Sequence, residues 1–298
     1  MNLSDLEIAL KSYVSALCTS ERNTSNCPEG LERARDYVLR AFQGLGYQTE
    51  LQEFPADGMI CANVEALPPG FVGHDKPHFI VGAHYDSAPG TVGADDNASA
   101  VAILLELARV FAGKLGAEAL RFVAYTNEEP PHFCSPTMGS VVHAKACRKR
   151  GDKITGMVCL ESLGLFTNEP GSQELPIEFD LLPEATRKLL LPPGLDPSIG
   201  NFLAVIGNPV SAEFMERFVC QMTNDEKLPV LATEILEIRL SDHLAYWDEG
   251  YPAIMLTDTA LYRNSHYHLA SDTPEKLNYP VMALLTERIA DAVGFLLK

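Results

Sequence analysis

The sequence predicts an α/β protein, a three-layer α/β/α sandwich with a mostly parallel mixed central sheet. Apolar runs of strand length alternate along the chain with longer segments whose apolar residues recur at helical spacing. The central runs are apolar throughout, which is typical of strands covered by helices on both faces. No linker, low-complexity segment or repeat divides the 298 residues, so we expect a single domain over 1–298.

The expected elements follow one another from the N-terminus. Helices are expected over 4–17 and 29–45, where apolar residues fall at helical spacing, and Gly46 ends the second. Later helices are expected over 98–111, 138–148, 212–222, within 239–250, and over 281–297. Strands are expected over 47–54, 59–67, 78–83, 120–125, 154–160, 201–206 and 252–257. Residues 164–200 are rich in Pro and Gly and predict an irregular insertion, with a short helix near 184–191.

The composition argues against several classes of protein. The net charge is −17, and the sequence has no basic stripe of the kind that binds nucleic acid; the basic run at 148–150 is expected to end a solvated helix. No apolar run reaches the ~18 residues of a membrane span. The N-terminus lacks the basic and apolar regions of a secretory signal. The seven cysteines form no CxxC pair and are typical of reduced thiols, so we expect a cytoplasmic protein.

Residues of the kind that bind metals follow several of the expected core strands. They are His84, Asp86 and Asp96 after the first, Glu128 and Glu129 after the next, Glu161 after the third, and His268 after the strand over 252–257. Ligand sites in open α/β sheets lie beyond the carboxyl ends of strands, so these side chains should share one cleft. Imidazole and carboxylate without thiolate suit Zn²⁺, and less often Co²⁺ or Mn²⁺.

The adjacent glutamates add a geometric argument. Successive side chains at a strand end point to opposite sides. One of Glu128 and Glu129 can therefore bind a metal while the other holds a proton acceptor over a bound water. Acids crowded in this way would repel one another unless cations sat among them.

Five short motifs carry a resemblance to a known family. They are HYD at 84–86, ADDNAS at 94–99, NEE at 127–129, LES at 160–162 and YHLASDT at 267–273. In this order and approximate spacing they resemble the zinc peptidases that include co-catalytic aminopeptidases, glutamate carboxypeptidases and glutaminyl cyclases. The likeness runs from about residue 30 to the C-terminus. It implies a phosphorylase/hydrolase-like fold that holds two Zn²⁺ ions.

The resemblance also implies roles for single residues. The implied metal ligands are Asp96 as the bridge, His84 and Glu161 for one zinc, and Glu129 and His268 for the other. Glu128 resembles the general base, and Asp86 resembles the carboxylate that orients the ligating imidazole. Tyr267 resembles a tyrosine that donates to the oxyanion in some members. The family also tends to have a cis peptide after the bridging acid, here Asp96–Asn97.

One position departs from the family pattern, and several other residues have no role in it. Most relatives have Asp where this chain has Glu161, whose side chain is one methylene longer and can still ligate. Asp242 and His243 lie in a loop that is expected either to contact the ligands or substrate, or to cap a helix. Asp95 is expected to be solvated or to cap the following helix. The remaining histidines considered, His74, His78, His132 and His143, are treated as structural.

The function that this reading favours is an aminopeptidase. Two zinc ions would share a water between them, Glu128 would take its proton, and the partner would be a peptide with a free N-terminus. The substrate pocket is expected to be lined by residues 164–200 and 210–245. One alternative is a glutaminyl cyclase, which uses one zinc and forms pyroglutamate. A lesser alternative is an inactive peptidase fold that serves as a binding scaffold.

Overall fold

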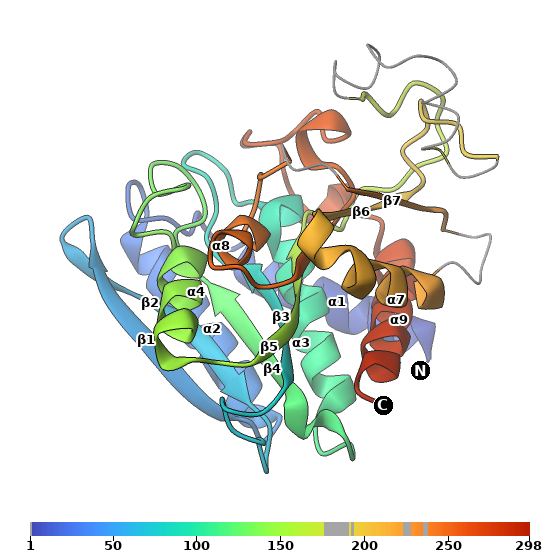
Figure 1. Ribbon diagram of the computed structural model, residues 1–298. Coiled ribbons are helices and arrows are strands. Elements are labelled where there is room, and N and C mark those ends of the chain that lie inside the picture. Colours follow the sequence, from blue (N-terminus) through green and yellow to red (C-terminus); the bar gives the residue numbers. More distant parts are fainter. Residues whose placement is uncertain (1, 176–190, 192–193, 223–227, 235–237) are drawn as a thin grey trace.

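An eight-stranded mixed sheet runs through the middle of the computed structural model, which describes residues 2–175, 191, 194–222, 228–234 and 238–298 (Figure 1). The strands are β1 (Gln48–Ala56), β2 (Met59–Leu67), β3 (His78–His84), β4 (Leu120–Tyr125), β5 (Ile154–Glu161), β6 (Leu203–Gly207), β7 (Val230–Glu234) and β8 (Ala253–Thr257). They lie in the order β1-β2-β4-β3-β5-β8-β6-β7. The β1–β2 hairpin forms one edge of the sheet, and β6 and β7 lie at the other (Figure 1).

Four parallel strands, β4, β3, β5 and β8, form the centre of this sheet. Their side chains are almost all buried, because helices cover both faces; this is why they appear in the sequence as continuous apolar runs. Antiparallel pairs occur toward the edges, between β1 and β2, between β2 and β4, and between β6 and β8. The prediction of an α/β fold around a mixed sheet is confirmed.

The helices form two layers around the sheet. They are α1 (Leu3–Leu17), α2 (Pro28–Gly44), α3 (Ala100–Phe111), α4 (Gly139–Arg150), α7 (Ala212–Met222), α8 (His243–Asp248) and α9 (Tyr279–Leu296). One core cluster joins α1, α2, α3, α7 and α9 to one face of the sheet, and a second joins α4 and α8 to the other face. Adjacent residues of β3 show the division: Ile80 belongs to the second cluster and Val81 to the first.

The structure departs from the sequence prediction at two places among the described residues. The helix expected from residue 98 begins at Ala100, because Ala94–Ser99 forms a separate turn with non-helical dihedral angles at Asp96 and Asn97. The cis peptide expected between these two residues is present. Strand β7 was not predicted; it is a short edge strand whose side chains are mostly half-buried, so it lacks an apolar run. The short helix expected near 184–191 falls, except for residue 191, outside the described residues.

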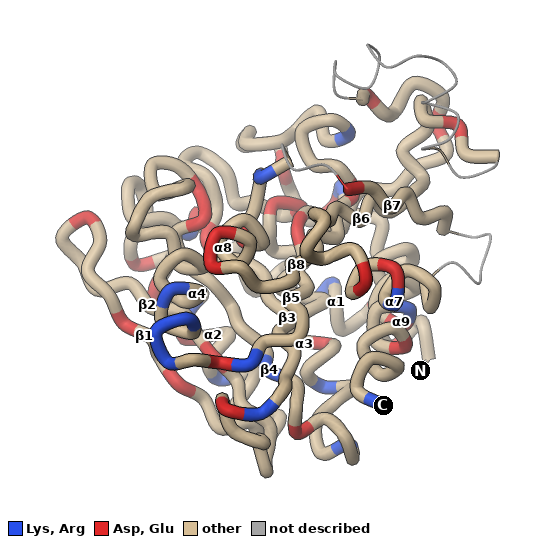
Figure 2. The backbone as a smooth tube through the Cα atoms, viewed as in Figure 1, with Lys and Arg blue, Asp and Glu red and all other residues tan. Residues whose placement is uncertain are grey.

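Charged residues are scattered over the molecule rather than gathered on one face (Figure 2). The basic run at 148–150 lies in the last turn of α4 and is exposed, as expected, and cations are favourable at that end of a helix. Among the helices that the structure describes, none has both the length and the apolar composition needed to cross a membrane.

Candidate metal centre

The carboxyl ends of the central strands bring the predicted ligands together. β3 ends at His84 and β5 ends at Glu161, and β3 pairs in parallel with both β4 and β5. The glutamate pair follows the carboxyl end of β4, on the same side of the sheet, and His268 lies on the loop after β8. Two groups of ligand atoms form there, each with its atoms within 4.8 Å of one another: His84, Glu128 and Glu161 in the first, and Asp96, Glu129 and His268 in the second.

Asp96 lies between the two groups and faces each with one oxygen. Its Oδ1 is 3.2 Å from Nε2 of His84, and its Oδ2 is 3.1 Å from Nε2 of His268. The same imidazole nitrogens lie 3.3 Å from Oε2 of Glu161 and 3.1 Å from Oε2 of Glu129, respectively. This is the placement that a carboxylate shared by two metal sites requires.

Several of these buried atoms make no hydrogen bond within the described part of the chain. They are Nε2 of His84, Oδ1 of Asp96 and Oε1 of Glu129. Buried polar atoms nearly always have a partner, so the lack of one here needs an explanation. Imidazole nitrogens and carboxylate oxygens without thiolate are a donor set that Zn²⁺ accepts. The residues present therefore fit a zinc site.

The crowding of acids in this buried space shifts the pKa values of the ligands. Burial lowers the pKa of His84, but Glu128 and Glu161 raise it well above its usual range. Burial likewise lowers the pKa of His268, while its hydrogen bonds to Asp96 and Glu129 raise it to about 10. Burial and the charge of Asp96 raise the pKa of Glu129 to about 8. In the metal-free protein, protons thus take the place of cations between the acids.

Zinc binding should therefore release protons at pH 7. Metal ligands must be deprotonated, and the raised pKa values of His84, His268 and Glu129 mean that protons occupy these groups at neutral pH. The apparent zinc affinity should fall as the pH falls below 7 and rise as it approaches 8 to 10. Calorimetric titration in buffers of different ionisation enthalpy measures the release, and an observed enthalpy independent of the buffer would contradict it.

Asp86 lies behind the centre and connects three of its parts. Its Oδ1 is 3.4 Å from Nδ1 of His84, the nitrogen that faces away from Asp96. The same carboxylate accepts hydrogen bonds from the backbone N–H of Glu128 at 3.2 Å and of Glu129 at 3.0 Å. A carboxylate in this position can fix both the ring of one ligand and the backbone of the glutamate pair.

Two serines hold the longer side chain of Glu161. Ser162 donates to Oε1 at 3.0 Å, and Ser241 donates to Oε2 at 2.6 Å. Sequence reasoning missed both, although Ser241 lies directly before Asp242, which was singled out. The hydroxyl groups restrict the extra rotatable bond that glutamate has over aspartate, so Glu161 still places Oε2 toward His84.

Of the residues named as additional candidates, Tyr267 lies against a predicted ligand, and Asp242 is buried within range of the charges of two others. The Tyr267 ring stacks on His268, with centroids 3.9 Å apart and planes at 17°. Burial and the nearby acids raise the pKa of Tyr267, so its hydroxyl remains a donor. Asp242 is fully buried, and burial raises its pKa to about 7, with His84 and Glu161 among the charges that act on it. Its side chain makes no capping hydrogen bond to α8.

His243 contacts other parts of the molecule. Its Nε2 lies 2.9 Å from the carbonyl oxygen of Ile238, and its ring packs edge-on against Trp247 with centroids 4.5 Å apart. Burial lowers its pKa to about 4, so the ring is neutral. The structure thus gives His243 contacts in the loop before α8 and in that helix, rather than with the ligands.

The expectation that Asp95 is solvated or caps a helix is wrong. Asp95 is fully buried, and its carboxyl group accepts hydrogen bonds from the backbone N–H of Gly164 at 2.9 Å and from Asn264 at 3.0 Å. It ties the turn that carries Asp96 to the segments that follow β5 and β8. A sequence pattern could not reveal this, because both partners lie far along the chain.

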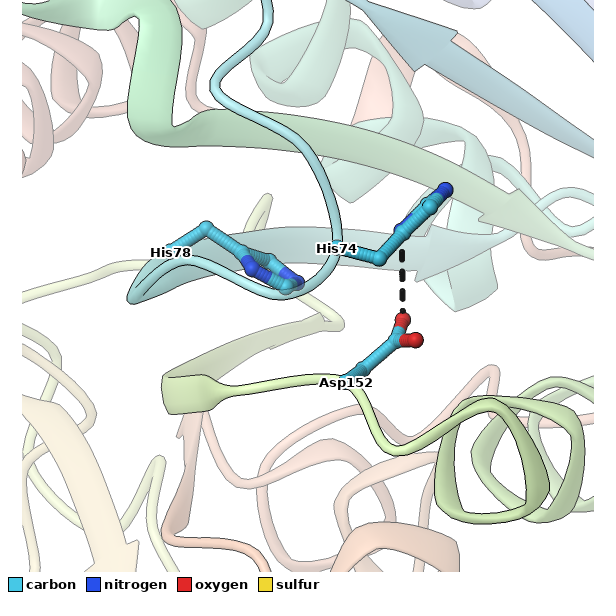
Figure 3. A group of neighbouring side chains, drawn as sticks. All are labelled: His74, His78 and Asp152. Atoms are coloured by element: carbon cyan, nitrogen blue, oxygen red, sulfur yellow. Dashed lines mark ion pairs between the residues drawn. The ribbon is translucent and has the colours of Figure 1, made fainter.

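A third group of metal-type side chains, His74, His78 and Asp152, lies at the opposite end of β3 (Figure 3). Here the cationic position is already filled. Nη1 of Arg121 donates to Nε2 of His78 at 2.8 Å and to Oδ2 of Asp152 at 3.0 Å. Arg150 forms two further bonds of 2.6 Å to the same carboxylate. Two guanidinium groups repel an added metal ion, so we assign this group to the structural network, as the sequence analysis did for both histidines.

Replacing Arg121 with methionine should destabilise the fold without changing zinc content. Arg121 is fully buried and pairs with Glu65 and Asp152, which would be left as buried, less well compensated charges. Breaking a buried pair in this way costs about 3–5 kcal/mol. Urea denaturation measures the loss, and metal analysis of the folded variant checks the zinc. A wild-type protein that binds a further zinc ion through His74 and His78 would contradict the assignment.

Comparison with known proteins places this geometry in a family. Residues 68–293 match the family model described as Peptidase family M28. The Escherichia coli K12 protein named YfbL is 37% identical over 273 residues, covering 88% of this chain and 79% of its own.

Two solved structures illustrate the range of enzymes that share the fold. The LapA aminopeptidase of Legionella pneumophila superposes with a TM-score of 0.72 at 15% identity, covering 98% of this chain and 72% of its own. A Porphyromonas gingivalis glutaminyl cyclase superposes with a TM-score of 0.69 at 15% identity, covering 98% of both chains. At this identity the two likenesses establish the fold alone. The family match over most of the chain establishes more: the protein belongs to peptidase family M28, and its metal centre fits zinc.

Proposed function

We propose that the protein is an aminopeptidase that uses two zinc ions to hydrolyse the first peptide bond of a peptide with a free N-terminus. The observation that carries the proposal is the placement of Asp96, whose two oxygens face two separate histidine–carboxylate groups. His84 and Glu161 would complete one zinc site, and Glu129 and His268 the other. When bound, zinc lowers the pKa of water and polarises a carbonyl group.

Glu128 is the proposed general base. Its Oε2 lies 3.8 Å from Nε2 of His84, at the margin of the centre, and its backbone is fixed by Asp86. Burial raises its pKa well above that of an ordinary carboxyl group, and the neighbouring glutamates raise it further. A base whose pKa is raised toward the working pH can take a proton from water and return it to the leaving amine. The Tyr267 hydroxyl supplies a donor for the developing oxyanion.

The charge of the centre supports recognition of an amino end. The carboxylates gathered there are Asp86, Asp96, Glu128, Glu129 and Glu161. Two zinc ions carry four positive charges, fewer than the negative charges of these five groups when all are ionised. The remaining negative charge favours a protonated α-amine and disfavours a C-terminal carboxylate.

A panel of three peptides tests the proposal: one with free ends, one acetylated at the N-terminus and one amidated at the C-terminus. We expect release of the first residue from the free and the amidated peptides and no cleavage of the acetylated one. Cleavage of the acetylated peptide at a comparable rate would exclude an aminopeptidase.

A glutaminyl cyclase is the second candidate, and one observation favours it. Both oxygens of Glu161 accept hydrogen bonds from serines, so this residue already has protein partners, and Asp96, Glu129 and His268 alone make a one-zinc site. The two candidates differ in metal stoichiometry and product. One tightly bound zinc together with conversion of an N-terminal glutamine peptide to its pyroglutamyl form would favour the cyclase.

A further inference from the structure

The segment that joins α1 to α2, residues 18–27, packs against the loop between His84 and Asp96. We call this segment the N-terminal strap. It precedes the residues matched by the family model, 68–293. Its side chains nonetheless reach the loop 85–93, which leads from one predicted ligand toward the next and carries Asp86. The contact is dominated by one buried arginine.

Arg22 is 1% exposed, and its guanidinium group is surrounded by carbonyl oxygens. Its Nε donates to the carbonyl oxygen of Tyr85 at 2.7 Å, and its Nη2 donates to that of Gly93 at 3.1 Å. Its other hydrogen bonds go to the carbonyl oxygens of Leu17, Val92 and Asp86. Four of these five acceptors belong to the loop 85–93, so a single side chain spans that loop from end to end.

The backbone of the strap fastens the same loop. The N–H of Arg22 donates to Oγ of Ser87 at 3.0 Å, and the N–H of Ser87 donates back to the carbonyl oxygen of Arg22 at 2.9 Å. The carboxylate of Glu21 accepts a hydrogen bond from the N–H of Gly90 at 3.0 Å. The loop has no helix or strand of its own, and these contacts supply hydrogen bonds that regular structure would otherwise provide.

The loop 85–93 is linked to the metal centre through Asp86, so a change in the position of the loop also moves the contacts that Asp86 makes. The guanidinium holds the carbonyl oxygens on both sides of that position, at Tyr85 and at Gly93. The Asp86 carboxylate in turn contacts His84 and the backbone N–H groups of Glu128 and Glu129. A shift of the loop would therefore move parts of both ligand groups together.

We propose that Arg22 is a positioning residue of the metal centre. Its hydrogen bonds fix the loop 85–93, so that Asp86 keeps the His84 ring and the backbone of the glutamate pair in the positions that metal binding requires. The inference rests on the proposed zinc centre and is independent of which bond the enzyme cleaves. Arg22 needs no contact with metal or substrate for this role. The guanidinium group of Arg22 is a cation surrounded by carbonyl oxygens, and it stabilises the loop as a structural metal ion does in other proteins.

The test compares two buried arginines, Arg22→Met and Arg121→Met, in the full-length zinc-loaded protein. Zinc affinity is measured by competition with a chromophoric chelator at a temperature where circular dichroism shows both variants folded. We expect Arg22→Met to weaken zinc binding by about 10- to 100-fold, the size of effect typical for groups that orient metal ligands. Arg121→Met, which alters the network at the other end of β3, should leave zinc affinity unchanged.

A conservative variant keeps the test decisive if Arg22→Met does not fold. Arg22→Lys retains the charge but has one ammonium group in place of the planar fork, so it should bind zinc with intermediate affinity. In whichever assay the enzyme supports, kcat should fall more than KM rises. Wild-type zinc affinity in a folded Arg22 variant would overturn the proposal, and so would equal weakening in Arg121→Met. If the wild-type protein cleaves none of the peptides but Arg22→Met still binds zinc more weakly than wild type, only the proposed function is contradicted.

Discussion

Replacing Glu128 with glutamine should lower kcat for an aminoacyl anilide by about 10²- to 10⁴-fold, the usual contribution of a general acid–base group. The amide cannot take a proton from water, yet it keeps the size and most of the contacts of the carboxylate. Glu128 is buried, and its backbone N–H donates a hydrogen bond to Asp86, so the change should not move the neighbouring ligands. Stopped assays at saturating substrate, with zinc content measured on the same sample, give both quantities.

Glu32→Gln is the matched control, because Glu32 is exposed on α2 and far along the chain from every ligand. It should retain wild-type activity and zinc. Two results would remove Glu128 from its proposed role. A variant with near wild-type turnover would show that no proton passes through it, and a variant that loses zinc would make it a ligand instead.

The elements of the fold that the sequence predicted are those with strong local patterns. β3 and β4 are continuous apolar runs because both faces are covered, and α3 combines helical spacing with burial of nearly all its side chains. β7 has neither property, since it is five residues long and lies at the edge. Its existence depends on pairing with β6, which no local window of sequence contains.

The same distinction separates the site residues that could be predicted from those that could not. Ligands at strand ends could be predicted, because the carboxyl ends of neighbouring parallel strands lie on the same side of the sheet. Of the residues that hold the ligands, only Asp86 was predicted, from the family resemblance. Ser241 reaches Glu161 across 80 positions and Arg22 reaches Tyr85 across 63, and hydroxyl or guanidinium groups carry no periodic signal. Asp95 was misjudged for the same reason, since its partners come from after β5 and after β8.

Replacing Asp96 with asparagine should have the largest effect on metal binding, because both groups share this residue. Asparagine has no negative charge and only one oxygen, so at most one of the two proposed zinc sites keeps a third ligand, a neutral amide, beside its imidazole and carboxylate, His84 with Glu161 or His268 with Glu129. Protein zinc sites ordinarily have at least three protein ligands. We therefore expect both zinc ions to be lost on dialysis against a weak chelator, and activity to be lost with them.

Asp95→Asn offers a control one residue away on the same turn. Asparagine removes the charge here just as it does at residue 96 and keeps one accepting oxygen, and burial and neighbouring acids already raise the pKa of Asp95 well above its usual range. This variant should keep both zinc ions, because the Asp95 hydrogen bonds above come from Gly164 and Asn264 rather than from ligands.

Metal analysis of the two dialysed variants shows whether Asp96 bridges two metal ions or is only a buried acid near them. Retention of two zinc ions by Asp96→Asn would contradict the bridge, and loss from both variants would assign the effect to the turn. Loss of a single zinc from Asp96→Asn would mean that the amide oxygen still serves one site, and Asp96→Ala, which has neither oxygen, must then lose both ions if the bridge is correct.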